Sequence, residues 1–230
     1  MPPIIADKYK LIDKYKFQFI EKVGAELEGG WEKQPSFQIA GDGSVRCRGN
    51  VLGEYRTVPA DNVTGLLKEI SEKYPDDIDE SCGFHIHASL KPLHMSYLSH
   101  EDFFKYFLVR MGNVGKYLRN SGNKNDYERF LHRFGGKNQY CARKFNPADQ
   151  IYKRAERRTM INFCSYRTHK TVECRMLPMF ELVRNAKMAA FEYVDTIESF
   201  VKEHKEPTKF KISIELPEDY NEIVKEETCV

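Results

Sequence analysis

The sequence predicts an α+β fold built on a mostly antiparallel sheet with helices packed on one face. Short segments of alternating apolar and polar residues, typical of strands with one buried face, recur along the chain. Glycine- and proline-containing turns separate them, as hairpins require. Two stretches with apolar residues at helical spacing, residues 103–111 and 182–204, would supply covering helices. No repeat or low-complexity linker divides the 230 residues, so we expect one domain over residues 1–217 and an acidic tail over residues 218–230.

The N-terminal elements begin with an ambiguous segment. Residues 6–21 combine apolar residues and lysines at irregular helical spacing, which fits a first helix or a partly extended chain. Residues 23–28 predict a strand that a glycine pair ends. Residues 36–39 and 45–48 alternate on either side of Gly41-Asp42-Gly43-Ser44, which predicts a hairpin.

In the middle of the chain, strands and helices follow one another. Residues 52–58 predict a strand that a proline closes, and residues 62–74 predict a helix with a polar residue at its N-cap. Residues 82–90 predict the next strand. Ser99 would cap the helix that carries the first apolar stripe.

The C-terminal part begins with a polar, glycine-containing stretch. Residues 120–150 predict a long loop next to an active site. Residues 159–166 and 171–177 predict a second hairpin. Residues 182–204 predict the longest helix, and residues 210–216 alternate like an edge strand.

The composition excludes several classes of protein. A hydrophobic content of 41% with 13% aromatic residues is that of a globular chain and not a disordered one. A net charge of +2 gives no global signal for polyanion binding, and no apolar run approaches the length of a membrane span. The six cysteines include no CxxC pair, and the first residues do not resemble a signal peptide, so we expect a reduced, cytoplasmic protein without membrane partners. Cys82 is expected to be a packed thiol.

Three segments place pairs of polar side chains on one strand face. His85 and His87 alternate within Gly83 to Ser89, and alternate strand residues point to the same side of a sheet. Two other segments repeat this spacing with charged residues: Glu26-Leu27-Glu28 and Glu173-Cys174-Arg175. Carboxylates mixed with imidazoles suit Mg²⁺ or Mn²⁺, and arginines offset the charge of a transferring phosphoryl group. The residues therefore predict ATP-dependent phosphoryl transfer on a two-metal site better than zinc hydrolysis.

These motifs resemble those of a known superfamily. Gly83 to Ser89 resembles the G-x-H-x-H-x-S strand of glutamine synthetase, Glu26-x-Glu28 its first metal-binding strand, and Glu173-x-Arg175 its late E-x-R strand. The chain is much shorter than glutamine synthetase and looks most like the compact amidoligase branch of the carboxylate–amine ligase superfamily. The resemblance runs from residue 24 to residue 176 and rests on these matches in order: Gly24-Ala25-Glu26-Leu27-Glu28, Asp42-Gly43-Ser44, Glu54, Gly83 to His87, Asn162 and Thr171-Val172-Glu173-Cys174-Arg175.

The resemblance implies a glutamine synthetase-like fold and a role for each residue. Glu26, His85 and Glu173 would hold one metal, and Glu28 and Glu54 the other. Cofactor binding or catalysis at the phosphates would involve His87, Arg157, Arg158, Asn162 and Arg175, with His87, Arg158 and Arg175 as the catalytic set. ATP would phosphorylate a carboxylate of a small molecule, a peptide or a macromolecule, and an amine would attack the acyl-phosphate. Such sites can be completed by neighbouring subunits, and a chain this short leaves room for a homo-oligomer.

Other interpretations of the same residues stay open at this point. The metal site could serve a metal-dependent phosphoester hydrolase. A basic cluster between Arg143 and Arg158 could make a non-catalytic nucleic-acid-binding module. Asp42 is expected to support its turn, Trp31 to pack in the core, and Glu54 fits a surface strand as well as a ligand.

Overall fold

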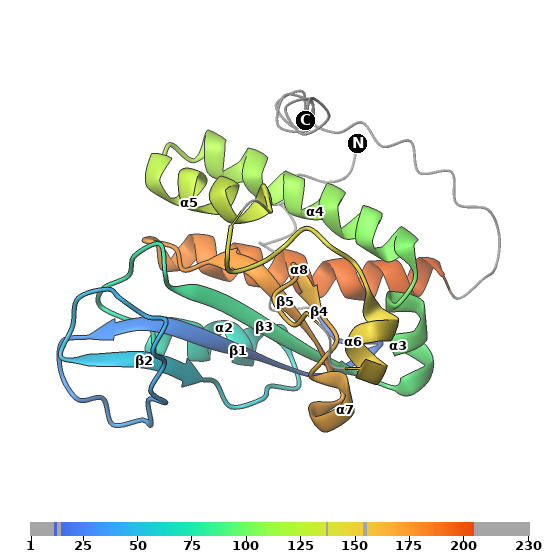
Figure 1. The fold of residues 1–230 in the computed structure, drawn as a ribbon, viewed down its shortest axis with the longest axis horizontal. Coiled ribbons are helices and arrows are strands. Elements are labelled where there is room, and N and C mark those ends of the chain that lie inside the picture. Colours follow the sequence, from blue (N-terminus) through green and yellow to red (C-terminus); the bar gives the residue numbers. More distant parts are fainter. Residues whose placement is uncertain (1–11, 13–14, 137, 154–155, 205–230) are drawn as a thin grey trace.

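The computed structural model describes residues 12, 15–136, 138–153 and 156–204 (Figure 1). The expected edge strand at residues 210–216 and the acidic tail at residues 218–230 lie outside the described residues, as does most of the ambiguous segment at residues 6–21.

Within the described residues, a five-stranded open antiparallel sheet organises the fold, as the sequence predicted for an α+β protein. Its strand order is β2-β1-β3-β5-β4. The bounds of the strands are β1 Ile20–Trp31, β2 Val51–Arg56, β3 Gly83–Leu90, β4 Ile161–Asn162 and β5 Thr171–Pro178. The two strands that carry alternating acidic or imidazole residues, β1 and β3, are therefore neighbours.

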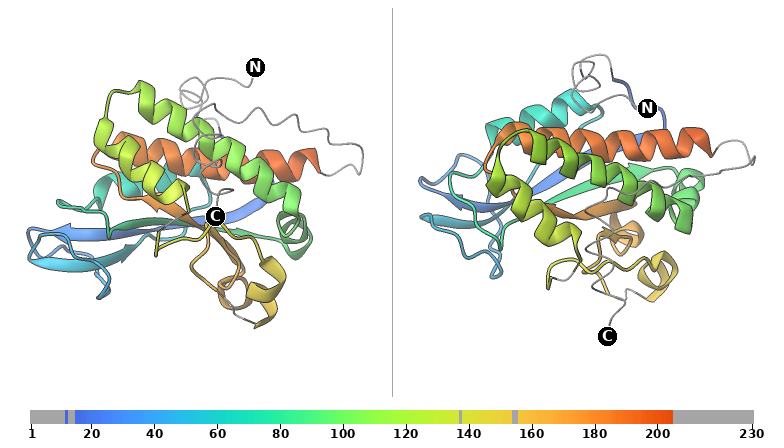
Figure 2. Two further views of the ribbon diagram at one scale, coloured as in Figure 1. Left: turned by 45° about the horizontal axis from the view of Figure 1, so that its top comes forward. Right: turned by 90° about the horizontal axis from the view of Figure 1, so that it is seen from above.

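The longer helices form a layer on one side of this sheet (Figures 1 and 2). In this layer α4 and α2 both pack against α8, and α5 packs against β5. The helices are α2 Val63–Glu72, α3 Pro92–Leu98, α4 Glu101–Asn120, α5 Lys124–Phe134, α6 Pro147–Lys153, α7 Tyr166–His169 and α8 Val183–Glu203. None of the helices in the described part of the chain has both the length and the apolar character that crossing a membrane requires.

The alternation along the strands separates an apolar face from a polar one. Leu27, Phe84, Ile86, Val172 and Cys174 are all completely buried and belong to the core shared with the helices. Burial of such side chains contributes about 1.5–3 kcal/mol each, so this face fixes which way each strand points. The intervening residues consequently project from the opposite face, where the candidate site lies.

The prediction of a hairpin around Gly41 is wrong, because residues 36–39 and 45–48 form no strands. Instead, Ala40 forms an isolated antiparallel bridge with Glu54, through hydrogen bonds of 2.8 and 2.9 Å between their backbones. A Cβ on Gly53 would lie 2.1 Å from the Ala40 carbonyl oxygen, and Gly53 has a φ of +154°, so glycine is required for this approach. The loop therefore lies against β2, and this position brings Asp42 to the polar face.

The prediction of a long loop at residues 120–150 is also wrong, because α5 and α6 occupy much of this stretch. Asn123 caps α5 by accepting a hydrogen bond from the Asp126 N–H, and Phe130 and Phe134 are buried on its inner side. Charged residues surround this narrow apolar stripe and conceal it in the sequence. The sequence also missed α3, and α7 interrupts the expected hairpin between β4 and β5.

Candidate metal centre

Strand register assembles the predicted ligands on the polar face of the sheet. Glu26 of β1 lies opposite His85 of β3, and Glu28 lies opposite Glu54 of β2. On the other side of β3, His87 pairs with Glu173 of β5, which pairs in turn with Asn162 of β4. Side chains that are far apart in sequence thus come into direct contact.

A cavity of about 890 Å³ opens over this face, a size suited to a small-molecule ligand. All the predicted site residues line it except Arg158. The acidic, basic and histidine residues of its lining are Lys22, Glu26, Glu28, Asp42, Glu54, Arg56, His85, His87, Arg157, His169, Glu173 and Arg175.

The first candidate metal cluster consists of Glu26, His87 and Glu173, whose ligand atoms lie within 4.8 Å of one another. His87 Nε2 is 3.3 Å from Glu26 Oε1 and 4.0 Å from Glu173 Oε1. This Nε2 atom is buried and has no hydrogen bond of acceptable geometry to another described residue, as expected for an imidazole nitrogen that can accept a metal. The cluster differs from the expected one, in which His85 took this place.

His85 instead lies among the carboxylates of both clusters. Its Nδ1 atom is 3.2 Å from Glu26 Oε2 and 3.7 Å from both Glu28 Oε1 and Glu173 Oε1. The ring is almost fully buried, so these contacts hold it between the two groups of ligands.

The second candidate cluster consists of Glu28, Asp42 and Glu54. Asp42 was expected only to support its turn, and it does so, because its Oδ1 atom accepts hydrogen bonds of 2.7 Å from the Ser44 N–H and hydroxyl. The bridge between Ala40 and Glu54 also brings the Asp42 carboxylate close to those of Glu28 and Glu54. Sequence reasoning missed this second role because nothing in the spacing shows that the loop lies along β2.

Two arginines contact the clusters. Arg175 Nη1 donates to Glu173 Oε1 at 2.5 Å, while its buried Nε atom has no hydrogen-bond partner in the described part of the chain. Arg56, which sequence reasoning missed, lies 2.5 Å from Glu54 Oε1 and 3.6 Å from Glu26 Oε1 through its Nε atom. The only signal in the sequence was that Arg56 alternates with Glu54 and so shares its strand face.

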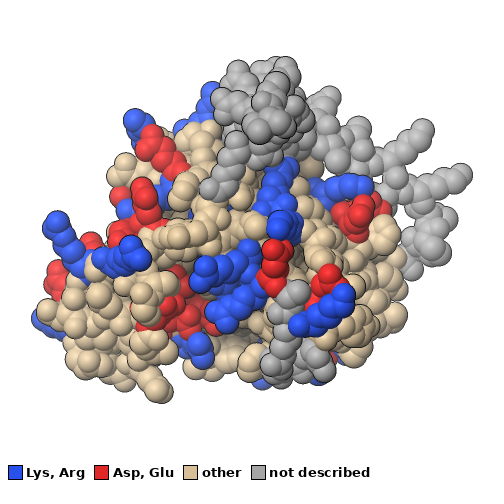
Figure 3. Space-filling model, viewed as in Figure 1, with Lys and Arg blue, Asp and Glu red and all other residues tan. Residues whose placement is uncertain are grey.

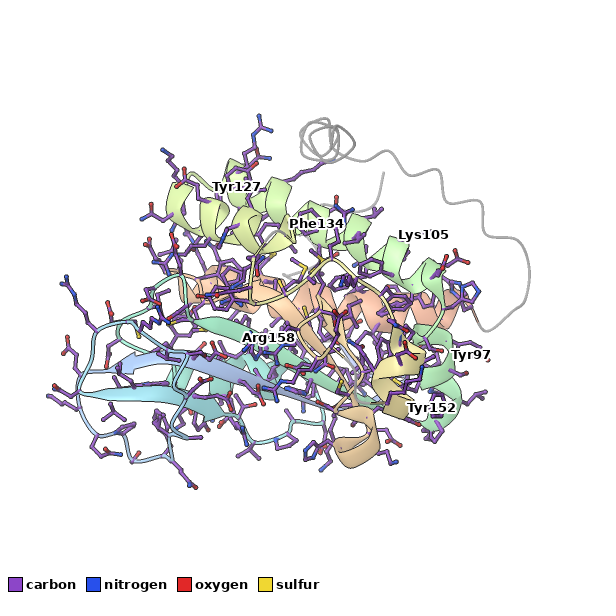
Figure 4. All side chains as sticks on the ribbon, viewed as in Figure 1. Tyr97, Lys105, Tyr127, Phe134, Tyr152 and Arg158 are labelled. Atoms are coloured by element: carbon purple, nitrogen blue, oxygen red, sulfur yellow. The ribbon has the colours of Figure 1, made fainter. Side chains whose placement is uncertain are left out.

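The remaining predicted residues differ in how they meet the cavity. Asn162 donates from Nδ2 to Glu173 Oε2 at 2.6 Å, so it orients a candidate ligand. Arg157 lines the cavity, whereas Arg158 lies outside the lining, just before β4 (Figure 4). The carbonyl of Arg158 accepts a hydrogen bond from the Ala142 N–H, which joins the preceding loop to this segment.

The charges of the site perturb one another. Burial opposes ionisation of Glu26, but contacts with His85 and His87 outweigh it and hold the Glu26 pKa well below its usual range. Burial raises the pKa of Glu54, and the nearby charge of Glu26 acts in the same direction. Burial opposes protonation of His87, yet Glu26 and Glu173 raise its pKa. Opposite charges thus stabilise a concentration of carboxylates that would otherwise repel one another.

The basic cluster between residues 143 and 158 is partly neutralised by acidic neighbours. Lys144 lies 3.1 Å from Glu156, and Lys153 lies 2.8 Å from Asp149. On the face seen in Figure 3, basic and acidic side chains are interspersed rather than separated by sign. This distribution gives little support to a nucleic-acid-binding surface there.

No protein-family model, curated protein or solved structure matches this chain.

Proposed function

We propose that this chain is an ATP-dependent carboxylate–amine ligase of the amidoligase type, which forms an amide bond through an acyl-phosphate. The observation that carries the proposal is the pair of clusters, Glu26–His87–Glu173 and Glu28–Asp42–Glu54, that face one cavity. The order of the sequence motifs supports the same assignment.

The donor atoms suit Mg²⁺ or Mn²⁺, because they are carboxylate oxygens with one imidazole nitrogen and include no thiolate. The two clusters would hold the ions, which when bound would neutralise the phosphates of ATP and the charge on the transferring group. His85 would keep the carboxylates of the two clusters apart, and Asn162 would orient Glu173 through its hydrogen bond.

The arginines at the cavity would bind and orient the anionic groups. Besides its contact with Glu173, Arg175 has a buried Nε atom to which no described residue is hydrogen-bonded, and Arg157 also lines the cavity. Arg157 is therefore a better candidate than Arg158 for a phosphate clamp. The resulting alignment would bring the substrate carboxylate to the transferring phosphoryl group of ATP.

The substrates would be a carboxylate and an amine, free or attached to a peptide or a larger molecule. We place the reaction in the cytoplasm, where Mg²⁺, ATP and reduced thiols are available. We also propose a homo-oligomer, in which a second copy of the chain would close the open side of the cavity.

The test is calorimetry of ATP binding in the presence and absence of Mg²⁺. Wild type should bind ATP only with Mg²⁺, and the Glu26→Ala, Glu173→Ala double variant should lose that binding. A double variant of two exposed glutamates outside the cavity, Glu21→Ala with Glu32→Ala, is the matched control and should bind like wild type. Metal-independent binding, or equal binding by both double variants, would contradict the site.

Activity then separates the ligase from the hydrolase. A screen of acid and amine pairs should release phosphate from ATP only when both substrates are present, and Arg175→Ala should abolish the release. Cleavage of phosphoesters without ATP would instead favour a metal-dependent phosphoester hydrolase on the same ligands.

A further inference from the structure

One buried arginine lies next to the candidate metal centre without belonging to either candidate cluster. Arg133, in the last turn of α5, is only 2% exposed. Among the described residues it forms no ion pair: its Nη2 atom lies 3.4 Å from the carbonyl oxygens of Glu80 and Ser81, and the guanidinium lies 4.7 Å from the centre of the Tyr140 ring. Arginine is seldom buried without a paired anion, because removing its charge from water costs several kcal/mol. Packing alone therefore does not explain why an arginine is buried at this position.

The guanidinium reaches the space left by Gly83, the first residue of β3. A Cβ atom on Gly83 would lie 3.3 Å from Arg133 Nη1, 2.9 Å from Glu28 Oε2 and 2.6 Å from His85 Nε2. A cation, a candidate ligand and the imidazole between the two clusters thus converge on one point. The Gly83 N–H also donates to Glu28 Oε2 at 2.5 Å.

We propose that Arg133 is a positioning residue for the metal centre. It holds the backbone at residues 80–81 through the two carbonyl contacts, and so fixes the start of β3 and the N–H of Gly83 that orients Glu28. Its guanidinium also limits the space in which Glu28 and His85 can move. The inference deepens the proposed function, since it takes Glu28 as a metal ligand.

Whether an Arg133 variant binds the metal more weakly or more tightly separates a positioning role from a purely electrostatic one. A guanidinium close to Glu28 repels a divalent cation, so its charge alone weakens metal binding, and removal of the charge would tighten it. Loss of a group that orients ligands has the opposite effect and typically weakens metal affinity 10–100-fold. A merely structural role at the C-terminus of α5 would lower stability without changing how the bound metal is coordinated.

The experiment is titration of the purified protein with Mn²⁺, followed by electron paramagnetic resonance. Arg133→Lys keeps the charge and loses the planar fork, and Arg133→Met keeps the length and loses the charge. Gly83→Ala fills the space from the other side, where the atoms that must yield first are the ends of the Glu28 and His85 side chains. We expect all three variants to bind Mn²⁺ at least about tenfold more weakly and to change the spectrum of the bound ion.

Arg129→Lys is the matched control. Arg129 belongs to the same helix and lines the same small cavity of about 260 Å³ as Arg133, but it contacts Ile78 and Glu181 instead of approaching Gly83. Its variant should bind Mn²⁺ like wild type. Tighter binding by Arg133→Met, or unchanged affinity and spectrum in Arg133→Lys and Gly83→Ala, would overturn the inference while leaving the metal site in place. Absence of Mn²⁺ binding by wild type would overturn the proposed function itself, and this inference with it.

Discussion

Glu198 of α8 should be the residue that secures the beginning of β1. Its carboxylate accepts hydrogen bonds from three consecutive backbone N–H groups: Oε1 from Phe19 at 3.0 Å and from Ile20 at 2.8 Å, and Oε2 from Gln18 at 2.9 Å. Phe19 and Ile20 are buried, so water cannot replace the carboxylate there, whereas Gln18 is exposed. Each unsatisfied buried N–H costs about 1–3 kcal/mol, so Glu198→Ala should lower the free energy of unfolding by roughly 2–6 kcal/mol.

Glu198→Gln tests whether geometry or charge is responsible. An amide oxygen in place of Oε1 keeps the two buried bonds, and only the bond to exposed Gln18 is lost, so the expected cost is below about 1.5 kcal/mol. Urea unfolding followed by the fluorescence of Trp31, the only tryptophan, reports directly on β1. Glu203→Ala, an exposed glutamate at the end of the same helix, should change stability by less than about 0.5 kcal/mol. Equal destabilisation by the alanine and glutamine variants would refute the geometric argument.

Three further outcomes follow from the structure. Asp42→Asn keeps the Oδ1 acceptor for its turn and loses the carboxylate, so thermal stability should stay unchanged. Calorimetry should show that its Mn²⁺ affinity is reduced by about tenfold or more. Unchanged affinity would remove Asp42 from the second cluster. Burial raises the pKa of Tyr15 and Tyr74 above the ordinary 10.0, so at alkaline pH the folded state keeps protons that the unfolded chain loses. The free energy of unfolding should therefore fall as the pH rises above 10, by up to about 1.4 kcal/mol per pH unit for each tyrosine. Unfolding measured against pH, with phenolate absorbance, checks this slope, and titration of both tyrosines in the folded protein would contradict it. Mg²⁺ at 100 times its dissociation constant should stabilise the protein by about 2.7 kcal/mol in urea unfolding, and no shift at any concentration would mean that the clusters hold no ion.

The sequence predicted the polar face of the sheet because side-chain direction in a strand depends only on local alternation. The face shared by Glu26 and Glu28, or by His85 and His87, needed no knowledge of the neighbouring strands. The choice of His87 for the first cluster, by contrast, depends on the register between β3 and β5. This register shifts between Phe84 and Ile86, and no local pattern in the sequence indicates the shift.

The groups that the sequence missed reach the site from segments with no periodicity to detect. Asp42 is delivered by a loop whose position depends on the close approach of Ala40 to Gly53. Arg133 belongs to a helix concealed by its charged residues, and its relation to β3 depends on the empty position at Gly83. In both cases a glycine on a strand permits a contact with a distant segment, and a single sequence shows the glycine without its partner.

The charge balance of the polar face indicates why the fold keeps an arrangement that is unfavourable for stability alone. Five carboxylates line one cavity, and like charges at such separations raise the free energy of the folded state. Arg56 and Arg175 offset part of this repulsion, but Arg56 is largely exposed, and exposed ion pairs contribute only about 0–1 kcal/mol. Apolar residues at these positions would remove the repulsion, and the hydrogen bonds lost would include those that Glu28 accepts from the Gly83 N–H and that Glu173 accepts from Asn162 Nδ2. This repulsion supports the proposal that the carboxylates bind a cation, and the opposite face, with its completely buried apolar residues, supplies the stability that such a site requires.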